Sequence, residues 1–374
     1  MLRQFLIVGL IGFSSMGIAL AEDYRAAYKL YNEATAAGDV EAARKHAKSA
    51  WQAAETELGD HPTTAVLAYN YGFEMLFEDA EEAQKALARV TELLEAGTTE
   101  APSVNFDLYV AYAAFRAAKK DEKKQSIRAL GKRVRDDDKV DLSYSYERGR
   151  IALEVASLAL YNEDFRDADA LAEISIKNFK SAVPDRPRIF AGAQLIKAVA
   201  ITIPEPRKID ALIEADTLLH EAGKAYPPVA SLDALNPTAM TVHAWITAMT
   251  SVADDSQSRD RRRFAKNRDQ LVRFNPINRG IEDEGVVCAV TWEKREPPSF
   301  PLGALRRGYI GSVIIGYHLS SEGEVIEPRV LAEVTQPQFG EVAMASVDDW
   351  KADVSDLPEA CLRDQITSFA FVIK

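Results

Sequence analysis

The stretch that decides the fold spans residues 306–330 and reads RRGYIGSVIIGYHLSSEGEVIEPRV. Apolar residues recur at every second position from Val313 to Leu319, which is the period of a half-buried β-strand. Ile314 adds one apolar side chain to the second face of this strand. The loop Ser320–Gly323 can make a tight turn, because glycine adopts positive φ angles freely. A second strand pattern follows the loop, and Pro328 within it indicates an edge position or a bulge, so the stretch predicts a β-hairpin.

The segments on both sides of the hairpin extend it to a small domain. Residues 286–292, VVCAVTW, are a strand candidate before it, and the chain ends in another candidate, QITSFAFVIK. Between the hairpin and the last strand, apolar residues recur at helical spacing, namely Phe339, Ala343, Met344, Val347 and Trp350. The order strand, hairpin, helix, strand predicts an α+β domain over residues 285–374, in which one helix packs on an antiparallel sheet.

The preceding residues, 22–255, have the pattern of a helical array. Amphipathic segments occur in pairs, and breaks such as Gly38-Asp39 combine a helix stop with an N-cap residue. The pairs are residues 24–57, 62–97, 103–135, 146–180 and 187–225, followed by one helix at 237–253. Helix pairs that recur at roughly 40 residues are typical of a solenoid, in which each pair buries its core against its neighbours. We therefore predict a mainly α domain of helical repeats.

This array resembles the tetratricopeptide repeat family. The residues that carry the resemblance are Ala156, Ala159, Phe165 and Ala168, Gly38-Asp39 with Ala43 and Ala50, and Asn70-Tyr71-Gly72. The family's tryptophan is missing from the first helices, and the spacing is longer than the family's. The resemblance implies a concave face that binds a peptide or protein. Two aromatic stripes, at residues 69–77 and 106–115, fit such a face, but they fit packing between helices equally well.

Residues from 298 onward resemble the C-terminal domain of the TonB energy-transducer family. The matching positions are Pro298-Ser299-Phe300-Pro301, Ala304, Arg306-Arg307, Gly311, Val313, Gly323, Val325, Val330 and the helical stripe from Phe339 to Trp350. Ala352 stands where the family has an aromatic residue, and Asp348-Asp349 stands where the family is basic. A helical array also replaces the family's long proline-rich linker.

The TonB resemblance implies a partner-binding strand at the end of the chain. In that family the last strand lies at the edge of the sheet and pairs with an extended peptide of an outer-membrane receptor. Such strand addition relies on main-chain hydrogen bonds for affinity. The corresponding positions here are Thr367, Ser368, Phe369, Ala370, Phe371, Val372 and Ile373. The alternative is an inner strand that only completes the sheet.

The first 21 residues have the pattern of a secretory signal peptide. Arg3 precedes an apolar stretch from Phe5 to Leu20, and the A-x-A pattern Ala19-Leu20-Ala21 predicts cleavage between Ala21 and Glu22. Glycines and serines interrupt the apolar stretch, which is also short for a membrane-spanning helix. The alternative interpretation is an uncleaved membrane anchor. Cleavage and export predict a periplasmic protein.

Cys288 and Cys361 are the two cysteines of the chain. An even number of cysteines in an exported protein favours a structural disulfide. The alternatives are a metal or redox pair and two buried thiols. Neither cysteine belongs to a C-x-x-C motif or has a histidine next to it in the sequence, which favours the disulfide.

Charge and motifs argue against nucleic-acid binding and catalysis. The net charge is −12, and the cations between Arg259 and Arg279 fall in a segment, 256–284, that we interpret as a basic linker. This linker could pair with the acidic array or, alternatively, contact anionic lipid. The five histidines are scattered, and the sequence has no phosphate-binding glycine loop and no G-x-S-x-G motif. We expect no enzymatic activity, no metal and no cofactor.

Three functions fit these patterns. The first is an exported periplasmic adaptor, whose array holds one protein or peptide while the C-terminal domain binds an extended peptide of an outer-membrane transport protein. The second is a membrane-anchored TonB-type energy transducer, which requires an uncleaved N-terminal segment because force must pass from the inner membrane. The third is a structural scaffold of helical repeats, in which the terminal domain binds no receptor.

Overall fold

The computed structural model describes residues 22–119, 122–138, 145–204, 208–254 and 288–372. These residues are mainly helical, with a small antiparallel sheet near the C-terminus. The chain divides into two compact units, Met1–Leu130 and Gly131–Lys374, so the first unit ends within the helical array. The predicted signal peptide and the predicted basic linker at 256–284 lie outside the described residues.

The first unit consists of amphipathic helices in pairs. They are α1 (Glu22–Ala37), α2 (Val40–Leu58), α3 (Pro62–Met75), α4 (Ala80–Glu95), α5 (Phe106–Ala117) and the start of α6 (Lys123–Asp138). Gly38 takes a positive φ of 74°, and the Asp39 side chain then accepts the Ala42 N–H at 3.0 Å. Asp79 caps α4 in the same way, so the predicted breaks begin new helices as expected.

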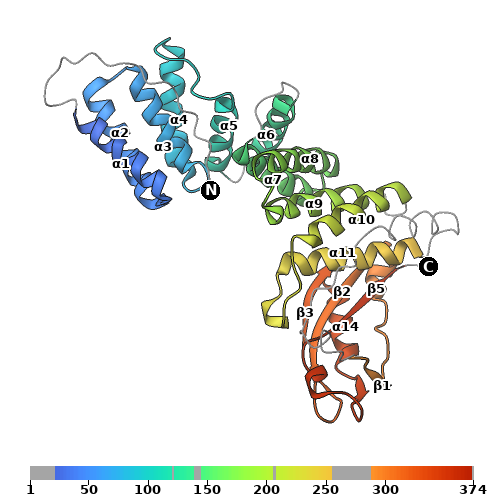
Figure 1. The fold of residues 1–374 in the computed structure, drawn as a ribbon. Coiled ribbons are helices and arrows are strands. Elements are labelled where there is room, and N and C mark those ends of the chain that lie inside the picture. The colour runs from blue at the N-terminus through green and yellow to red at the C-terminus, as the bar shows by residue number, and fades with distance from the viewer. Residues whose placement is uncertain (1–21, 120–121, 139–144, 205–207, 255–287, 373–374) are drawn as a thin grey trace. The chain divides into compact units, whose positions relative to one another are not determined.

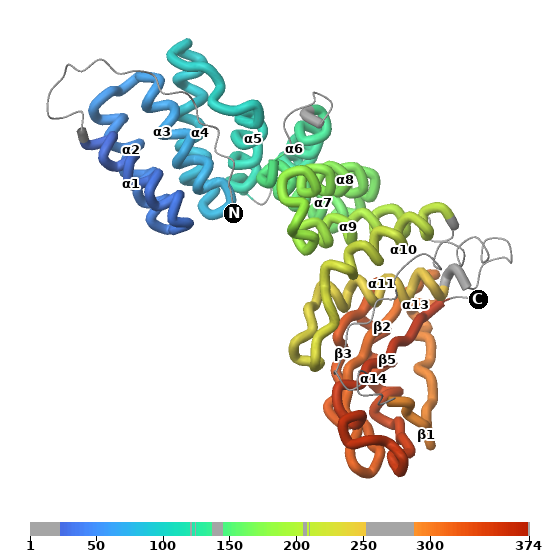
Figure 2. Tube along the Cα trace, in the orientation of Figure 1, coloured from blue at the N-terminus to red at the C-terminus, as the bar shows by residue number. Residues whose placement is uncertain are grey.

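The second unit continues the array. Its helices are the rest of α6, α7 (Tyr146–Tyr161), α8 (Phe165–Ala182), α9 (Pro187–Thr202), α10 (Ile209–Lys224), the 3-10 turn η1 (Leu232–Ala234) and α11 (Pro237–Asp254). The first helices of the five pairs begin at residues 22, 62, 106, 146 and 187, in steps of 40 to 44 residues. Figure 2 follows the chain through these successive helix pairs. The helical repeats are therefore confirmed, and their tetratricopeptide type stays a prediction.

The aromatic stripes of the first unit pack between helices. The ring centroids of Phe73 and Tyr109 are 5.6 Å apart, and those of Phe77 and Tyr112 are 5.2 Å apart. These pairs join α3 and the residues after it to α5, and Tyr112 is fully buried. The packing interpretation of the stripes is thus confirmed for these rings.

The C-terminal region contains the predicted hairpin, helix and last strand. Its elements are β1 (Thr291–Lys294), α13 (Leu302–Arg307), β2 (Gly311–Leu319), β3 (Val325–Val334), α14 (Gln338–Val347), β4 (Lys351–Asp353), the 3-10 turn η3 (Glu359–Leu362) and β5 (Gln365–Phe371). The strands β3, β2 and β5 form an antiparallel sheet in that spatial order. The first predicted strand is shorter than expected and pairs with β4 in a separate two-stranded sheet.

The three-stranded sheet carries a helix on each face, whereas the sequence predicted one packed helix. One face of β2, including Val313, packs against α14. On the other face, Ile314 packs against Ala244 and Ala248 of α11, and the Ser312 hydroxyl donates a hydrogen bond to the Ala244 carbonyl. Figure 1 shows α11 lying against β2, β3 and β5. The predicted helix is present as α14, but the packing of α11 on the second face was missed. Ile314 was the main sign of that buried face, and one apolar residue does not identify the helix that covers it.

Candidate functional site: the outer edge of β5

The last strand lies at an edge of the sheet. β2 is central, and β5 pairs with it from Gly311↔Phe371 to Tyr317↔Gln365 without a register shift. Within the described ranges, no backbone–backbone hydrogen bond joins the opposite side of β5 to another segment. We call this side the outer edge of β5. Its main-chain N–H and C=O groups can therefore accept a further strand.

The other edge of the sheet, on β3, is irregular. Pro328 has no N–H to donate, and Glu327 has a positive φ of 50°. The pairing of β3 with β2 shifts register between Ile314 and Ile315 and again between Gly316 and His318. Bulges and proline blunt a strand edge, because a regular partner strand cannot follow it. The edge or bulge predicted from Pro328 is present, and β5 is the better template for strand addition.

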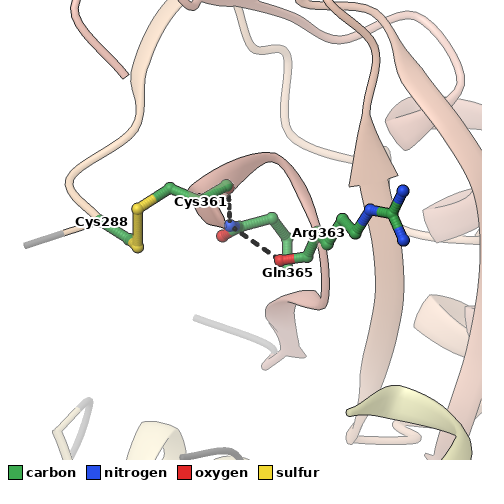
Figure 3. Close-up of a disulfide and its surroundings, with 4 residues drawn as sticks. All are labelled: Cys288, Cys361, Arg363 and Gln365. Carbon is green, nitrogen blue, oxygen red and sulfur yellow. Dashed lines mark hydrogen bonds between the residues drawn. A yellow bond between two sulfur atoms is a disulfide. The ribbon is translucent and has the colours of Figure 1, made fainter. Parts of the chain in front are cut away.

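A disulfide lies just before β5. The sulfur atoms of Cys288 and Cys361 are 1.97 Å apart, their Cα atoms are 5.3 Å apart, and Cys361 is fully buried. Figure 3 shows how Gln365, the first residue of β5, turns its side-chain amide toward the chain that follows Cys361. This amide donates hydrogen bonds to the carbonyl oxygens of Cys361 and Arg363. The start of β5 is thereby fixed to the disulfide.

Asp364 ties the same point to the helical array. It has a positive φ of 54°, and its N–H donates to Nδ1 of His318 at 3.0 Å. Its carboxylate accepts the N–H of Leu232, at the start of η1, at 2.9 Å. No sequence pattern pointed to Asp364 or His318, because their hydrogen bonds join three segments that are far apart in the sequence.

The two faces of β5 differ in chemistry. On the α11 face, Ser368 and Ala370 are small and exposed. On the α14 face, the Phe369 ring lies 5.5 Å from that of Trp350, and Phe371 stacks on Phe339 at 4.5 Å. A strand added beside β5 would meet small side chains on one face and aromatic rings on the other.

The segment Arg295–Phe300 contacts β5 at Thr367 and at Phe371. The Arg295 guanidinium stands 4.7 Å from the ring centroid of Trp350 and donates to the Thr367 hydroxyl at 3.4 Å. Phe300 lies 5.7 Å from Phe371. No sequence pattern pointed to Arg295, whereas Phe300 belongs to the motif Pro298-Ser299-Phe300-Pro301.

The carbonyl of Glu296, within this segment, accepts a hydrogen bond from the Trp350 indole at 2.9 Å. This bond attaches the segment to the end of α14. The segment makes no backbone–backbone bond with β5.

The predicted partner-binding residues fall into three groups. The first five, Thr367 to Phe371, lie in β5 as expected. Val372 follows the strand and packs against the hydrophobic cluster of α9, α10 and α11, so the usable edge ends near Phe371. Ile373 lies outside the described residues.

The predicted signal cleavage falls between Ala21 and Glu22. Ala21 also lies outside the described residues, while Glu22 begins α1.

Three features of the described part of the chain bear on metals, small molecules and membranes. This part contains no group of three or more His, Cys, Asp or Glu side chains that could hold a metal ion. A hollow of about 90 Å³ beside β1 and β4 is well below the 300 Å³ or so of ordinary ligand pockets. No helix among the described residues is both long and apolar enough to cross a bilayer.

No protein-family model matches this chain, and no curated protein sequence matches it.

Proposed function

We propose that this chain is a periplasmic protein-interaction adaptor of the TonB family, and that it binds an extended peptide of an outer-membrane transport protein by strand addition. The observation that carries the proposal is the outer edge of β5. It is regular, contains no proline and has no backbone partner among the described residues, whereas the β3 edge is broken by Pro328 and two register shifts. The helical array is the proposed site of a second partner.

The energetics of strand addition show which contacts would give specificity. The seven residues of β5 can offer about six to eight main-chain hydrogen bonds, since alternate residues point to the outer edge. Each bond adds about 1 kcal/mol net, while ordering each peptide residue costs about 1–2 kcal/mol. Main-chain bonds alone therefore do not exceed the cost of ordering a peptide as long as β5. Contacts with Phe369, Trp350 and the small side chains of Ser368 and Ala370 would supply affinity and selectivity.

The test uses synthetic peptides copied from the periplasm-facing segments of outer-membrane transport proteins of the same cell. Binding to the full chain is measured by titration calorimetry. Two N-methylated versions of a binding peptide are then compared, one methylated at odd positions and one at even positions. Strand addition predicts that one version loses binding and the other keeps it, because only alternate peptide amides face β5. Equal loss or equal retention would contradict the main-chain mechanism.

A pair of matched protein variants locates the site. Ala370→Lys places a charge on the exposed part of β5, and Val330→Lys places one on the exposed β3 edge. Charged side chains on a strand edge oppose pairing, so Ala370→Lys should weaken peptide binding and Val330→Lys should not. The reverse result would move the site to β3.

The intact mass of the protein from the cell separates adaptor from transducer. A soluble species that begins at Glu22 supports the adaptor. A membrane-bound species that retains residues 1–21 would favour the energy transducer instead.

A further inference from the structure

The short helix α13 presents apolar side chains to solvent. Its six residues bury Ala304 in the hydrophobic core of the C-terminal region, whereas Leu302 and Leu305 are 69% and 42% exposed. Because residues three and four positions apart share a helix face, Leu302, Leu305 and Arg306 project together.

Two cations complete this surface. Arg306 and Arg307 occupy the last turn of α13, and both are exposed. Among the described residues, no ion pair joins either arginine to a carboxylate. Arg307 is held in place, because its Nε donates to the Gly303 carbonyl at 3.0 Å and its guanidinium lies 5.3 Å from the Tyr309 ring centroid. The two arginines therefore place positive charge beside two exposed leucines, on a chain with a net charge of −12.

The exposure of these side chains favours a lipid surface over a helical peptide as the partner of α13. Recognition of a peptide helix uses an apolar groove, whereas Leu302 and Leu305 are both exposed on one short helix. The hollow beside β1 and β4 includes no residue of α13. Projecting leucines flanked by arginines instead suit a surface that deforms around them, such as the boundary between lipid head groups and acyl chains. Anionic head groups attract the arginines.

We propose that α13 docks on an anionic lipid surface, with Leu302 and Leu305 at the acyl boundary and Arg306 and Arg307 among the phosphates. The contact is weak and reversible, because a helix of six residues buries little area. It does not depend on strand addition, since no residue of α13 belongs to β5.

A single fluorescent label tests this contact in the full chain. Both native cysteines are paired, so Leu302→Cys introduces the only free thiol, which is labelled with the environment-sensitive dye nitrobenzoxadiazole. Val104→Cys is the matched control, because Val104 is 64% exposed and belongs to the first unit. The probes are vesicles of phosphatidylcholine alone and vesicles that also contain phosphatidylglycerol.

The expected result is a blue shift of the dye at position 302 with anionic vesicles, and none at position 104. Replacing Arg306 and Arg307 together by Gln should weaken vesicle binding about 30-fold, the factor for two cations near an anionic surface. Higher salt should also weaken it. An absent shift, an equal shift at position 104 or an equal shift with neutral vesicles would overturn the proposal. A shift with an acidic helical peptide but not with vesicles would also overturn it, by assigning α13 to a protein partner.

Discussion

Gly149 of α7 provides a sharp test of how the helix pairs pack. A Cβ atom at this position would lie 2.7 Å from Cδ1 and Cε1 of Phe179 on α8, and 3.2 Å from the Cβ of Asn178. Phe179 is 1% exposed, so its ring is enclosed by neighbouring groups and has no solvent-facing side. Gly149→Ala should therefore disrupt the contact between α7 and α8.

The magnitude follows from two opposing terms. Overpacking a buried contact costs about 1–3 kcal/mol, while replacing glycine by alanine in a helix gains up to about 1 kcal/mol. The net loss for Gly149→Ala should be about 1–2 kcal/mol. For a unit of this size that lowers the unfolding temperature by about 2–8 °C.

Gly192→Ala is the matched control in the same unit. Gly192 lies within α9, and a Cβ there would meet no atom within 4 Å. The helix-propensity gain is then unopposed, so this variant should be more stable than the wild type by about 0.5–1 kcal/mol.

The assay is thermal and denaturant unfolding of both variants, followed by circular dichroism. Adding Phe179→Leu to Gly149→Ala should recover part of the lost stability, because the smaller side chain vacates the ring position. Equal or greater stability of Gly149→Ala compared with the wild type would refute the packing between α7 and α8.

Three further predictions concern the second unit. Burial, together with the nearby His220, lowers the pKa of His243 to about 4, below the unfolded value of 6.5. The unfolded chain therefore takes up the proton first, and His243 should cost about 3 kcal/mol of stability as the pH falls from about 6.5 to 4. Denaturant unfolding across this range should show a shallower acid loss for His243→Gln, and an unchanged slope would contradict the shift. Reduction of the Cys288–Cys361 disulfide, which has a sequence separation of 73, should lower the unfolding free energy by about 4 kcal/mol. Denaturant unfolding with and without dithiothreitol measures this loss of stability, and equal stability in the two conditions would argue against the bond. Ile314→Ala should cost about 2–5 kcal/mol in denaturant unfolding, because Ile314 is fully buried between the sheet and α11, and a loss under 1 kcal/mol would argue against this packing.

Much of the helical array could be predicted from the sequence. Its helices follow the apolar period and its breaks carry explicit signals, such as Gly38 with a positive φ before the capping Asp39. The hairpin was equally visible, because strict alternation on β2 and the glycine-containing turn act locally. Local rules of this kind need no knowledge of distant segments.

The features of the fold that the sequence did not predict depend on contacts between residues far apart in the chain. β4 has three residues, Lys351–Asp353, which are too few to show a period, and its partner β1 lies almost 60 residues earlier. The packing of α11 on the sheet likewise brings together Ala244 and Ile314, which are far apart in the sequence. Around the candidate site, Asp364 and Arg295 act through His318 and Trp350, and no spacing in the sequence links these residues.

Amide hydrogen exchange resolved at single residues tests most directly whether the outer edge of β5 is free. Successive amides of an antiparallel strand point to opposite edges. A free outer edge therefore predicts alternation along Gln365–Phe371 in the unliganded full chain, with slow exchange for amides bonded to β2 and fast exchange for those between them. A bound receptor peptide should slow the fast set. Uniformly slow exchange along β5 without any peptide would contradict a free outer edge, because both edges of the strand would then already be paired.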